Sequence, residues 1–535
     1  MNFDPLYYPY PSRRSTVFAA RGMVATSQPL AAQAGLEVLK KGGNAIDAAV
    51  ATATCLTVVE PTSNGIGGDA FALVWTGGKL HGINSSGPAP RSISLQALAN
   101  AGHQNMPEYG VCPVTVPGAP AGWAELARRF GRLPLTVSMG PAIEYAERGF
   151  PVSPVVADRW EAALRIYNTQ QGDEFSHWFE TFAPRGRAPF AGEIWRLPDQ
   201  AASLSAIAET NAETFYYGPL AERIDAFFRR YSGYLTADDL ASFRPEWVEP
   251  VKINYHGYDV WEIPPNGHGI VALMALNILN GFEFHERDSA ETFHRQIEAV
   301  KLAFADGLKY VADIRRMKVR PEDLLSESYA AERRKLIGDR ALDPVPGKPH
   351  AGGTVYLATA DGEGNMVSYI QSNYEGFGSG MVVPGTGIAL HNRGFCFSWD
   401  PAHDNCLEPG MKPYHTIIPG FLTKDGEPVG PFGVMGGFIQ PQGHVMVISN
   451  TVDFHLNPQA ALDAPRFRWR QGKIVDLEAN FPAHVAEALL RRGHDVRYGA
   501  VGDREFGRGQ IIRRDRNGVL AGGSEPRADG QVAAW

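Results

Sequence analysis

The spacing of apolar residues changes along the chain from a helical to a strand-like pattern. Leucine, alanine and valine recur at helical spacing over residues 29–41, and Gly42-Gly43 marks the end of that helix. Asn44 is a suitable N-cap for a second helix over residues 45–58, whose many small side chains favour close packing inside the protein. Beyond residue 354, short apolar runs separated by turn residues predominate, which is typical of strands.

The same patterns predict the other elements. We expect helices over residues 29–41, 45–58, 123–130, 270–279, 290–311, 458–464 and 482–492, and a mostly helical stretch over 133–245. We expect strands over residues 70–75 and from the next turn to about 83, and over 251–263, 354–360, 366–371, 421–423 and 445–452. Residues 340–353 predict an exposed linker. A helix-rich part followed by a strand-rich part, with strands in both, favours one layered sandwich that the two parts share.

The composition is that of a soluble globular protein and argues against several other classes. Of the 535 residues, 44% are apolar and 20% are charged; the net charge is -8 and no block of Lys and Arg occurs, which argues against nucleic-acid binding. The four cysteines form no paired motif, so we expect neither a disulfide framework nor a zinc ribbon. No secretory signal is evident, and the longest apolar run, over residues 48–59, is too short to span a membrane. We therefore expect a cytoplasmic protein.

One threonine is distinguished by its position in the chain, after two glycines and before a strand-like stretch. Gly352 and Gly353 end the predicted linker, and Thr354 opens the predicted strand over residues 354–360. A cut before Thr354 would give its hydroxyl a neighbouring free α-amine, which can serve as a base near neutral pH. Gly353 would tolerate the strained backbone that an internal N-to-O acyl shift requires. The alternative is an ordinary turn that opens a strand.

Many further segments, in a consistent order, are similar to segments of one protein family. They are residues 22–26, 38–50, 65–69, 115–122, 376–380, 384–388, 390–398 and 433–437. On these segments the chain resembles the gamma-glutamyltranspeptidase family of N-terminal nucleophile hydrolases over nearly its whole length. The resemblance implies an α+β fold, a four-layer αββα sandwich, in which residues 1–353 and 354–535 form one joint globular unit.

The resemblance also assigns roles to particular residues. Thr354 corresponds to the family's catalytic threonine, which is both nucleophile and α-amine base, so the cut would fall between Gly353 and Thr354. Gly436 and Gly437 match a glycine pair whose N–H groups form the oxyanion hole, and a developing oxyanion needs two such donors. Ser372 lies where the family places a hydroxyl that hydrogen-bonds the nucleophile; a solvent-facing strand residue is the alternative. The two fragments would form an αβ heterodimer, or a dimer of such heterodimers.

The chain departs from the family's glutamyl transferases at the positions that hold the amino-acid group of the substrate. Ser86 stands in place of an arginine that binds the α-carboxylate, and Arg91 is the nearest basic residue. Cys396 stands in place of an aspartate that binds the α-amine. His415 and Thr416 replace two serines that bind the carboxylate. The resemblance therefore implies acyl transfer from an amide, with an acyl group that is not glutamyl.

These departures favour an amidohydrolase whose substrate lacks an α-amino group. Arg393 lies beside the pocket segment and is a candidate to bind a substrate carboxylate through two hydrogen bonds, with a structural ion pair as the alternative. Tyr374 is a further candidate lining residue. Family members of this kind include oxamate amidohydrolases of purine catabolism, and we take oxamate as the predicted substrate. The alternatives are a glutaryl (cephalosporin) acylase, a gamma-glutamyltransferase or glutathione hydrolase, and an inactive scaffold. No metal or organic cofactor is implied.

Other catalytic classes find less support. His294 and Glu298 lie one helical turn apart, but no HExxH motif or third ligand accompanies them, so we expect a surface salt-bridge partner rather than a metal site. No GxSxG pentapeptide occurs, and residues 376–381 do not complete a nucleotide-binding glycine motif. We expect His268, in a turn of Pro and Gly, to be structural.

Overall fold

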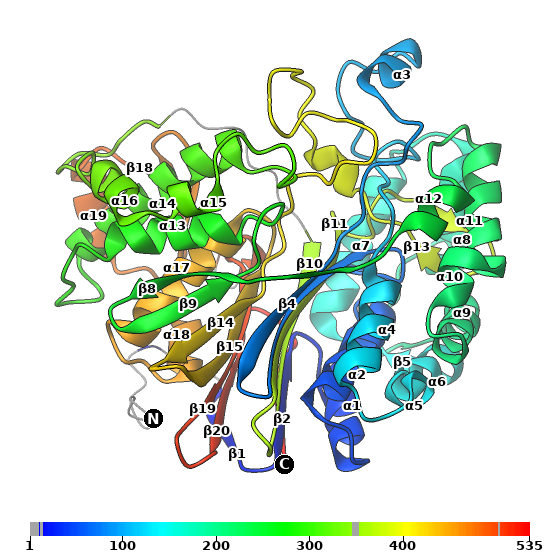
Figure 1. The fold of residues 1–535 in the computed structure, drawn as a ribbon, viewed down its shortest axis with the longest axis horizontal. Helices are drawn as coiled ribbons and strands as arrows, with labels where there is room; N and C mark the ends of the chain where they lie inside the picture. Colours follow the sequence, from blue (N-terminus) through cyan, green and yellow to red (C-terminus); the bar gives the residue numbers. More distant parts are fainter. Residues whose placement is uncertain (1–9, 11–13, 345–352, 501–502) are drawn as a thin grey trace.

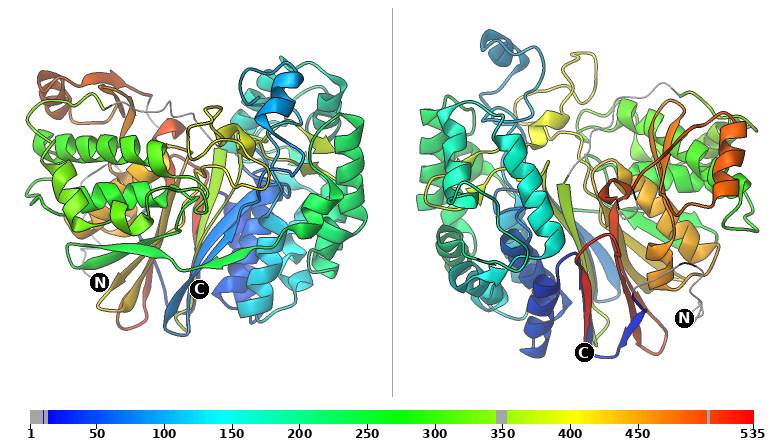
Figure 2. Two further views of the ribbon diagram at one scale, coloured as in Figure 1. Left: turned by 45° about the horizontal axis from the view of Figure 1, so that its top comes forward. Right: turned by 180° about the vertical axis from the view of Figure 1, so that it is seen from behind.

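Two β-sheets packed face to face, each covered on its outer side by helices, make up the molecule (Figure 1). The computed structural model describes residue 10 and residues 14–344, 353–500 and 503–535. Each of the two sheets has seven strands, and both views in Figure 2 show them between two groups of helices. The predicted α+β fold, a four-layer αββα sandwich, is confirmed.

All neighbouring strands in both large sheets are antiparallel. The first sheet has the order β1-β20-β19-β15-β14-β9-β8. Its strands are β1 (Val17–Ala19), β8 (Val251–Tyr255), β9 (Tyr258–Glu262), β14 (Gly420–Lys424), β15 (Glu427–Met435), β19 (Arg508–Arg514) and β20 (Leu520–Ser524). The second sheet has the order β21-β2-β10-β11-β3-β4-β7. Its strands are β2 (Gly22–Thr26), β3 (Asp69–Thr76), β4 (Lys79–Ser85), β7 (Glu246–Val248), β10 (Gly353–Asp361), β11 (Met366–Tyr374) and β21 (Gln531–Ala534).

One group of helices lies on the side of the second sheet, where α1 contacts β2 and α2 contacts β10. This group consists of α1 (Pro29–Lys40), α2 (Ala45–Val59), α4 (Ala119–Phe130), α5 (Leu135–Ser138), α6 (Gly140–Arg148), α7 (Pro154–Tyr167), α8 (Ser176–Phe182), α9 (Pro198–Glu209), α10 (Glu213–Tyr217), α11 (Pro219–Arg230) and α12 (Ala237–Ser242). Helix α3 (Leu95–Asn100) projects away from this group at the top of Figure 1.

The other group lies on the side of the first sheet, where α17 contacts β15 and α13 contacts β8. It consists of α13 (Gly269–Leu279), α14 (Ala290–Tyr310), α15 (Pro321–Leu324), α16 (Glu327–Arg334), α17 (Ile439–Val452), α18 (Pro458–Asp463) and α19 (Ala483–Arg491). Short strands outside the two large sheets pair locally: β5 (Phe150–Pro151) with β6 (Ile194–Trp195), β12 (Val382–Val383) with β13 (Ile388–Ala389), and β16 (Phe467–Gln471), β17 (Ile474–Leu477) and β18 (Asp495–Tyr498) with one another.

The centre of the second sheet is buried on both faces, and its sequence explains why. All nine residues of β11 are buried, because the first sheet covers one face and α2 lies over the other. All fifteen residues of α2 are buried too, and its alanines and threonines allow close approach to the sheet. Its start is fixed by a capping box, in which the Asn44 side chain accepts from Asp47 N–H and the Asp47 carboxylate accepts from Asn44 N–H.

The segments before and after residue 353 both contribute strands to both sheets. In the first sheet, β1, β8 and β9 come from the earlier segment and the other four strands from the later one. In the second sheet, β10 and β11 of the later segment lie between β2 and β3 of the earlier one. The hydrophobic core is therefore built jointly, and neither segment contains all the strands of either large sheet.

Two predicted strands differ from the structure. Residues 445–452, predicted as a strand, are the second half of helix α17. This helix is buried on every side, so it lacks the polar face that would have revealed a helical period. The single strand predicted over residues 251–263 is a hairpin of β8 and β9, turned at His256-Gly257, where both residues have positive φ angles. Of the predicted linker over residues 340–353, residues 345–352 lie outside the described residues.

Candidate active site

Thr354 lies at the start of β10, where the pairing of this strand with β11 is irregular. The register shifts between Gly353 and Val355, and a bulge of this kind re-aims a side chain. Thr354 is buried, with 1% of its surface exposed. Its Oγ1 atom lies 3.2 Å from Oγ of Ser372, and the amide Nε2 of Gln440 lies 3.5 Å from the same oxygen. Two side chains, one from β11 and one from α17, thus converge on the hydroxyl of β10.

Ser372 is fully buried on β11 and does not face solvent. Its Oγ accepts a hydrogen bond from the backbone N–H of Tyr374 at 2.7 Å. Because a hydroxyl can accept and donate at once, Ser372 can direct its own proton toward Thr354 Oγ1. That arrangement stabilises negative charge on the threonine oxygen.

A buried ion pair holds the backbone of Thr354 from the other side. Arg508 of β19 donates from Nη2 to the Thr354 carbonyl oxygen at 3.4 Å and from Nη1 to Glu60 Oε1 at 3.1 Å. Ser27 donates to the second carboxylate oxygen of Glu60 at 2.5 Å. The sequence prediction missed Arg508 and Glu60. Each of the two is a charged residue at the edge of an apolar stretch, which was the available signal. Arg508 follows Gly507, and Glu60 follows the uncharged end of α2.

Gly436 and Gly437 form the turn that leads from β15 into α17. Their φ angles are +133° and +68°, and a Cβ atom on Gly436 would come within 2.7 Å of Ile439. Both features require glycine at this turn. Gln440, three residues further on, is the residue whose side chain reaches Thr354 Oγ1. The turn and the nucleophile are thereby parts of one site, while the oxyanion role of the two N–H groups remains a prediction.

Arg393 is fully buried at the start of a 3-10 turn, Arg393–Cys396. Its Nη1 donates to Thr416 Oγ1 at 2.8 Å, and its Nε donates to Asp69 Oδ2 at 3.2 Å. The guanidinium carbon lies 4.5 Å from the centre of the Tyr374 ring, a cation–π contact. Nη2 has no hydrogen-bond partner among the described residues. The Cys396 thiol and the carboxyl of Glu375 also interact with this guanidinium.

Asp69 of β3 is the charged centre of this part of the site, and the sequence prediction missed it as a site residue. Its Oδ2 also accepts from His391 Nδ1 at 3.0 Å and from His415 Nε2 at 2.9 Å. Burial alone would raise the pKa of Asp69, but His391 and His415 hold the pKa below its ordinary value, so the carboxylate is ionised. Burial and the nearby Arg393 lower the pKa of His415 to about 3, which makes that ring neutral.

A closed chain of contacts connects the nucleophile to the arginine. Its members, in order, are Thr354, Ser372, Tyr374, Arg393, Thr416, Ile418 and Gln440, where Thr416 and Ile418 are joined along the backbone through Ile417. The last link is a hydrogen bond from Ile418 N–H to Gln440 Oε1 at 3.0 Å. The structure therefore brings together predicted residues that are distant in sequence.

The other predicted pocket residues have different surroundings. Ser86 is buried; it donates to Asn84 Oδ1 at 2.7 Å and accepts from Asn266 Nδ2 at 3.3 Å. Cys396 is near Tyr374 and Arg393, and burial raises the pKa of its thiol, so it carries no negative charge. Arg91 has an exposed side chain. An amino-acid clamp at the positions of Ser86 and Cys396 is thus chemically absent.

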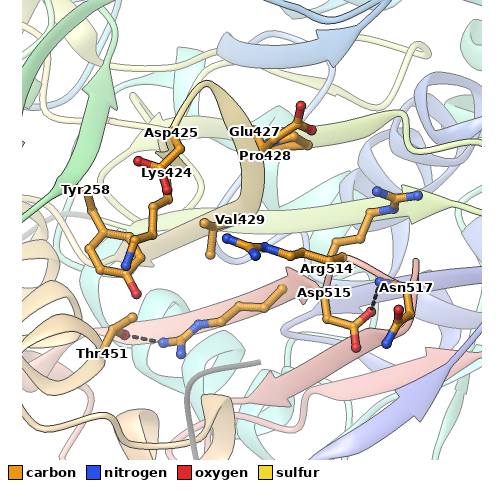
Figure 3. Close-up of a pocket in the computed structure, with 12 residues that line it drawn as sticks. Tyr258, Lys424, Asp425, Glu427, Pro428, Val429, Thr451, Arg514, Asp515 and Asn517 are labelled. Atoms are coloured by element: carbon orange, nitrogen blue, oxygen red, sulfur yellow. Dashed lines mark hydrogen bonds between the residues drawn. The ribbon is translucent and has the colours of Figure 1, made fainter.

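An open hollow of about 830 Å³ lies elsewhere on the molecule (Figure 3). None of the predicted site residues lines it, and its charges are mixed, with Lys424 and Arg514 beside Asp425 and Glu427. Its lining residues are Tyr258, Lys424, Asp425, Glu427, Pro428, Val429, Thr451, Arg513, Arg514, Asp515, Arg516 and Asn517. We assign no function to it.

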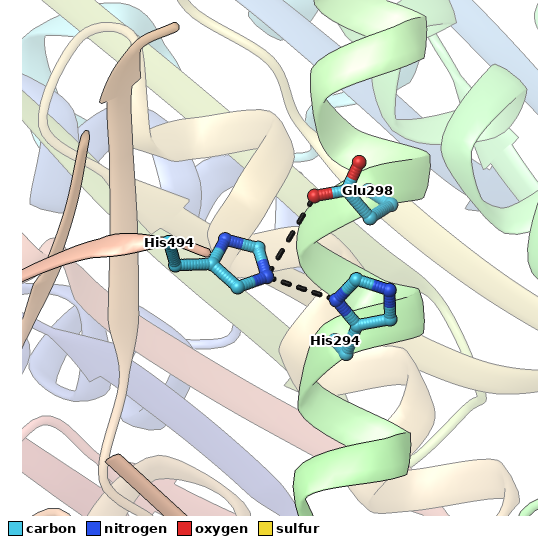
Figure 4. Close-up of side chains that lie close together, drawn as sticks. All are labelled: His294, Glu298 and His494. Carbon is cyan, nitrogen blue, oxygen red and sulfur yellow. Dashed lines mark hydrogen bonds and ion pairs between the residues drawn. The ribbon is translucent and has the colours of Figure 1, made fainter. Parts of the chain in front are cut away.

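The prediction that His294 and Glu298 are surface salt-bridge residues is wrong. Both are buried on α14, and His494 completes a cluster with them (Figure 4). His294 Nδ1 lies 2.9 Å from His494 Nε2, and the remaining His294 nitrogen bonds the Gly338 carbonyl at 2.8 Å. The buried ammonium of Lys301 lies 2.7 Å from Glu298 Oε1, where a metal ion would bind that oxygen. A lysine thus already supplies the cation of this cluster.

Comparison with known proteins gives consistent results over the whole chain. Residues 31–535 match the family model for gamma-glutamyltranspeptidase. The chain is 36% identical to the "Glutathione hydrolase-like YwrD proenzyme" of Bacillus subtilis, over 96% of this chain and 98% of that one. It is 34% identical to the "Oxamate amidohydrolase proenzyme" of Klebsiella pneumoniae, over 97% and 100%. A solved structure, cephalosporin acylase from Bacillus halodurans, shares 64% identity and a TM-score of 0.96, over 100% and 99%.

The layered fold and these relatives define the class of protein: a hydrolase of amide bonds with the fold of N-terminal nucleophile hydrolases. Within that class, the chain belongs to the gamma-glutamyltranspeptidase family. Both curated relatives are named as proenzymes. Among the described residues, no helix has the length and apolar character needed to cross a membrane.

Proposed function

We propose that the chain is a proenzyme that cuts itself between Gly353 and Thr354 into fragments 1–353 and 354–535, which remain together as a heterodimer. Thr354 Oγ1 attacks the Gly353 carbonyl carbon, the peptide C–N bond breaks, and an ester with a free α-amine results. Water then hydrolyses the ester, giving the Gly353 carboxylate and the Thr354 hydroxyl. The convergence of Ser372 and Gln440 on Thr354 Oγ1 supports this assignment, and the joint sheets explain why the fragments would stay together.

The cleaved enzyme would use the same hydroxyl on an external amide. The α-amine of Thr354 takes the hydroxyl proton while Oγ1 attacks the amide carbon. The N–H groups of Gly436 and Gly437 stabilise the oxyanion, the leaving amine takes the proton, and an acyl-enzyme ester forms. A water molecule then attacks the ester and releases the acid. No step requires a cofactor.

The substrate would be the amide of a small carboxylate without an α-amino group, such as oxamate, which gives oxalate and ammonia. One observation carries this proposal: Arg393 is a buried cation with an unpartnered Nη2, in the contact chain that includes Thr354. A carboxylate is the ligand that complements such a group. An α-ammonium group would have no carboxylate at position 396, because Cys396 is a neutral thiol.

A second candidate function is that of a glutaryl (cephalosporin) acylase. The 64% identity to the solved cephalosporin acylase favours it. Oxalyl and glutaryl groups share a terminal carboxylate and lack an α-amine, so Arg393 could serve either. They differ in length, and the distance from the attacked carbonyl to the arginine decides between them.

Cleavage is tested by denaturing electrophoresis and N-terminal sequencing. Wild-type protein should give two fragments, the smaller of which begins at Thr354, and Thr354→Ala should remain one chain. Thr359→Ala is a matched control, since Thr359 is a buried threonine in the same strand that bonds Ala45 O at 2.7 Å. The control should still be cut. Two fragments from Thr354→Ala would refute the assignment of the nucleophile.

Substrate class is tested by a panel of amides assayed with the cleaved enzyme. Ammonia release is measured from oxamate and glutamine, and amine release from glutathione and a glutaryl amide. Oxamate or the glutaryl amide should react best, and a preference for glutamine or glutathione would overturn the proposed substrate class. A single uncut chain without activity on any of the four would favour an inactive scaffold. Unchanged product ratios with added glycylglycine would exclude transfer to an amine.

A further inference from the structure

Arg508 borders both parts of the candidate catalytic site, although it comes from the other sheet. It lies directly opposite Met435 in the pairing of β19 with β15, and Met435 immediately precedes Gly436. A Cβ atom on Gly436 would lie 3.4 Å from the Cα atom of Gly507. Gly507 thus packs against the turn at Gly436, and Arg508 is the next residue in the chain. The Arg508 side chain reaches across to Thr354.

Arg508 forms a buried ion pair with Glu60 and also contacts the backbone of Thr354. Its Nη2 bonds the Thr354 carbonyl oxygen at 3.4 Å, and its Nη1 bonds Glu60 Oε1 at 3.1 Å. Only 3% of either charged side chain is exposed. A buried ion pair of this kind is often no more stabilising than well-packed apolar residues. The feature that apolar residues could not reproduce is a positive charge beside Thr354.

We infer that Arg508 is a positioning residue that holds the backbone of Thr354 from the opposite sheet, and that its charge keeps the Thr354 α-amine in the neutral form needed for a base. The inference rests on the proposed function, since the α-amine exists only after cleavage before Thr354. Glu60 has the opposite electrostatic effect on the amine, and Arg508 outweighs it because Arg508 is the partner that touches Thr354.

The size of the effect follows from the geometry. The nitrogen and the carbonyl oxygen of one residue are at most about 3.6 Å apart, so Arg508 Nη2 lies within about 7 Å of the α-amine. At an effective dielectric constant of about 20, a unit charge at that distance changes a protonation equilibrium by more than about tenfold. Glu60 cancels part of this change. A net effect of about tenfold on the fraction of free amine is therefore expected.

Few other groups near this end of β10 can titrate. The charged or titratable side chains beside this end of β10 are Tyr374 in β11, Glu60 after α2 and Arg508 in β19. Two carboxyl groups lie one step further away: Glu375, which follows Tyr374, and Asp69, which stands opposite Ser372 in the pairing of β3 with β11 and is held ionised. Burial raises the pKa of Tyr374 well above its ordinary value, so its hydroxyl stays neutral. The guanidinium of Arg393 lies over the Tyr374 ring. Burial and the neighbouring Glu108 raise the pKa of Glu375, so Glu375→Gln is a further control: a limb that stays in place in this variant reports the α-amine.

The test is the pH dependence of kcat/KM for the cleaved enzyme on its best amide substrate. Arg508→Gln should move the acid limb to higher pH, which lowers the activity at pH 6 relative to the plateau about tenfold. Glu60→Gln should move the limb the opposite way and raise the relative activity at pH 6. Arg508→Lys keeps the charge and should leave the limb in place. Arg513→Gln, a buried arginine of the same strand, is the control and should leave it in place.

Opposite shifts in the two charge variants support the inference, because a merely structural role would lower the plateau without moving the limb. An unmoved limb in both variants overturns it. If Arg508→Gln is not cleaved, the acid limbs of Glu60→Gln and Arg508→Lys alone decide whether the inference holds. N-terminal sequencing separates the two levels of failure. A Thr354 N-terminus with an unmoved limb refutes only the role of Arg508, while an active enzyme without that N-terminus refutes the proposed function.

Discussion

Mild acid should destabilise the fold through histidines that are buried in their neutral form, and His494 is the one to vary. Burial and the ammonium of Lys301 lower the pKa of His494 to about 2. The pKa of a histidine in the unfolded chain is about 6.5. Between these values the unfolded state binds a proton that the folded state does not, so the free energy of unfolding falls as the pH falls below about 6.5. Above that pH the group has no such effect.

The magnitude can be worked out for pH 5. Each pH unit below the unfolded value costs about 1.4 kcal/mol per histidine, so His494 alone removes about 2 kcal/mol at pH 5. His415 and His444, whose pKa values burial lowers to about 3, act in the same direction and by the same amount. Together the three remove at most about 6 kcal/mol, a large part of the 5 to 15 kcal/mol typical of a folded protein.

The variant His494→Gln isolates one of these contributions. At pH 7 it should destabilise the fold by about 1 to 3 kcal/mol, because His294 Nδ1 loses its partner at 2.9 Å. Between pH 7 and pH 5 the free energy of unfolding of this variant should fall by about 2 kcal/mol less than that of its parent, because the variant lacks the buried neutral imidazole. The two stability curves therefore converge toward pH 5.

Urea unfolding at pH 5, 6, 7 and 8 measures this, with tryptophan fluorescence as the probe. Thr354→Ala serves as the parent, because a single uncut chain avoids the concentration dependence of two fragments. His484→Gln is the control: His484 is exposed at the start of α19, ten residues before His494, and its loss should change neither the stability nor its pH dependence. Equal slopes for His494→Gln and its parent would refute the role of the buried neutral histidine.

Four further substitutions test other parts of the molecule. Gly436→Ala should lower kcat about 100-fold to 1000-fold, as measured in steady-state assays, because the added Cβ meets Ile439 at 2.7 Å and moves the N–H group proposed as an oxyanion donor. Ser372→Ala should lower kcat with little change in KM, since the hydroxyl acts on the developing charge; a change in KM alone would contradict this. Arg393→Met should raise KM for carboxylate-bearing amides about tenfold or more and leave an uncharged amide unaffected. Lys301→Met should destabilise the fold by about 3 to 5 kcal/mol in thermal or urea unfolding, because a buried carboxylate loses its cation.

Much of the fold follows from patterns visible in the sequence, and the exceptions have physical causes. Helix α14 was predictable because its apolar residues occupy one face over twenty-one positions. Helix α17 was not, because burial on every side leaves a run of β-branched residues that matches a strand equally well. Ladder partners such as β19 and β15 are distant in the chain, and no local pattern pairs them.

The site shows the same division. Thr354 and Gly436 were chosen from local glycine chemistry and from the family resemblance, and their catalytic roles stay predictions. Asp69, Glu60 and Arg508 were not, since each acts through a contact with a segment far away in the sequence. A charged residue in an apolar segment indicates burial with a partner, but the sequence alone does not identify that partner. His294 shows the cost of this limit, because its helix-turn spacing to Glu298 gave no sign of His494, 200 residues later.

The arrangement of the two sheets explains how the proposed cut before Thr354 could leave the fold intact. Thr354 lies at the first residues of β10, and the rest of that strand is paired on both sides, with β2 and with β11. Release of the preceding segment would break the pairing of Gly353 with Tyr374 and leave the ladder from Val355 to Ala360 in place. Arg508 and Gln440 reach Thr354 from the other sheet and its covering helix, so they hold the new terminus independently of the segment that is cut away. A free α-amine can therefore form in a site whose other parts are already fixed, which is the condition for catalysis by a preorganised site.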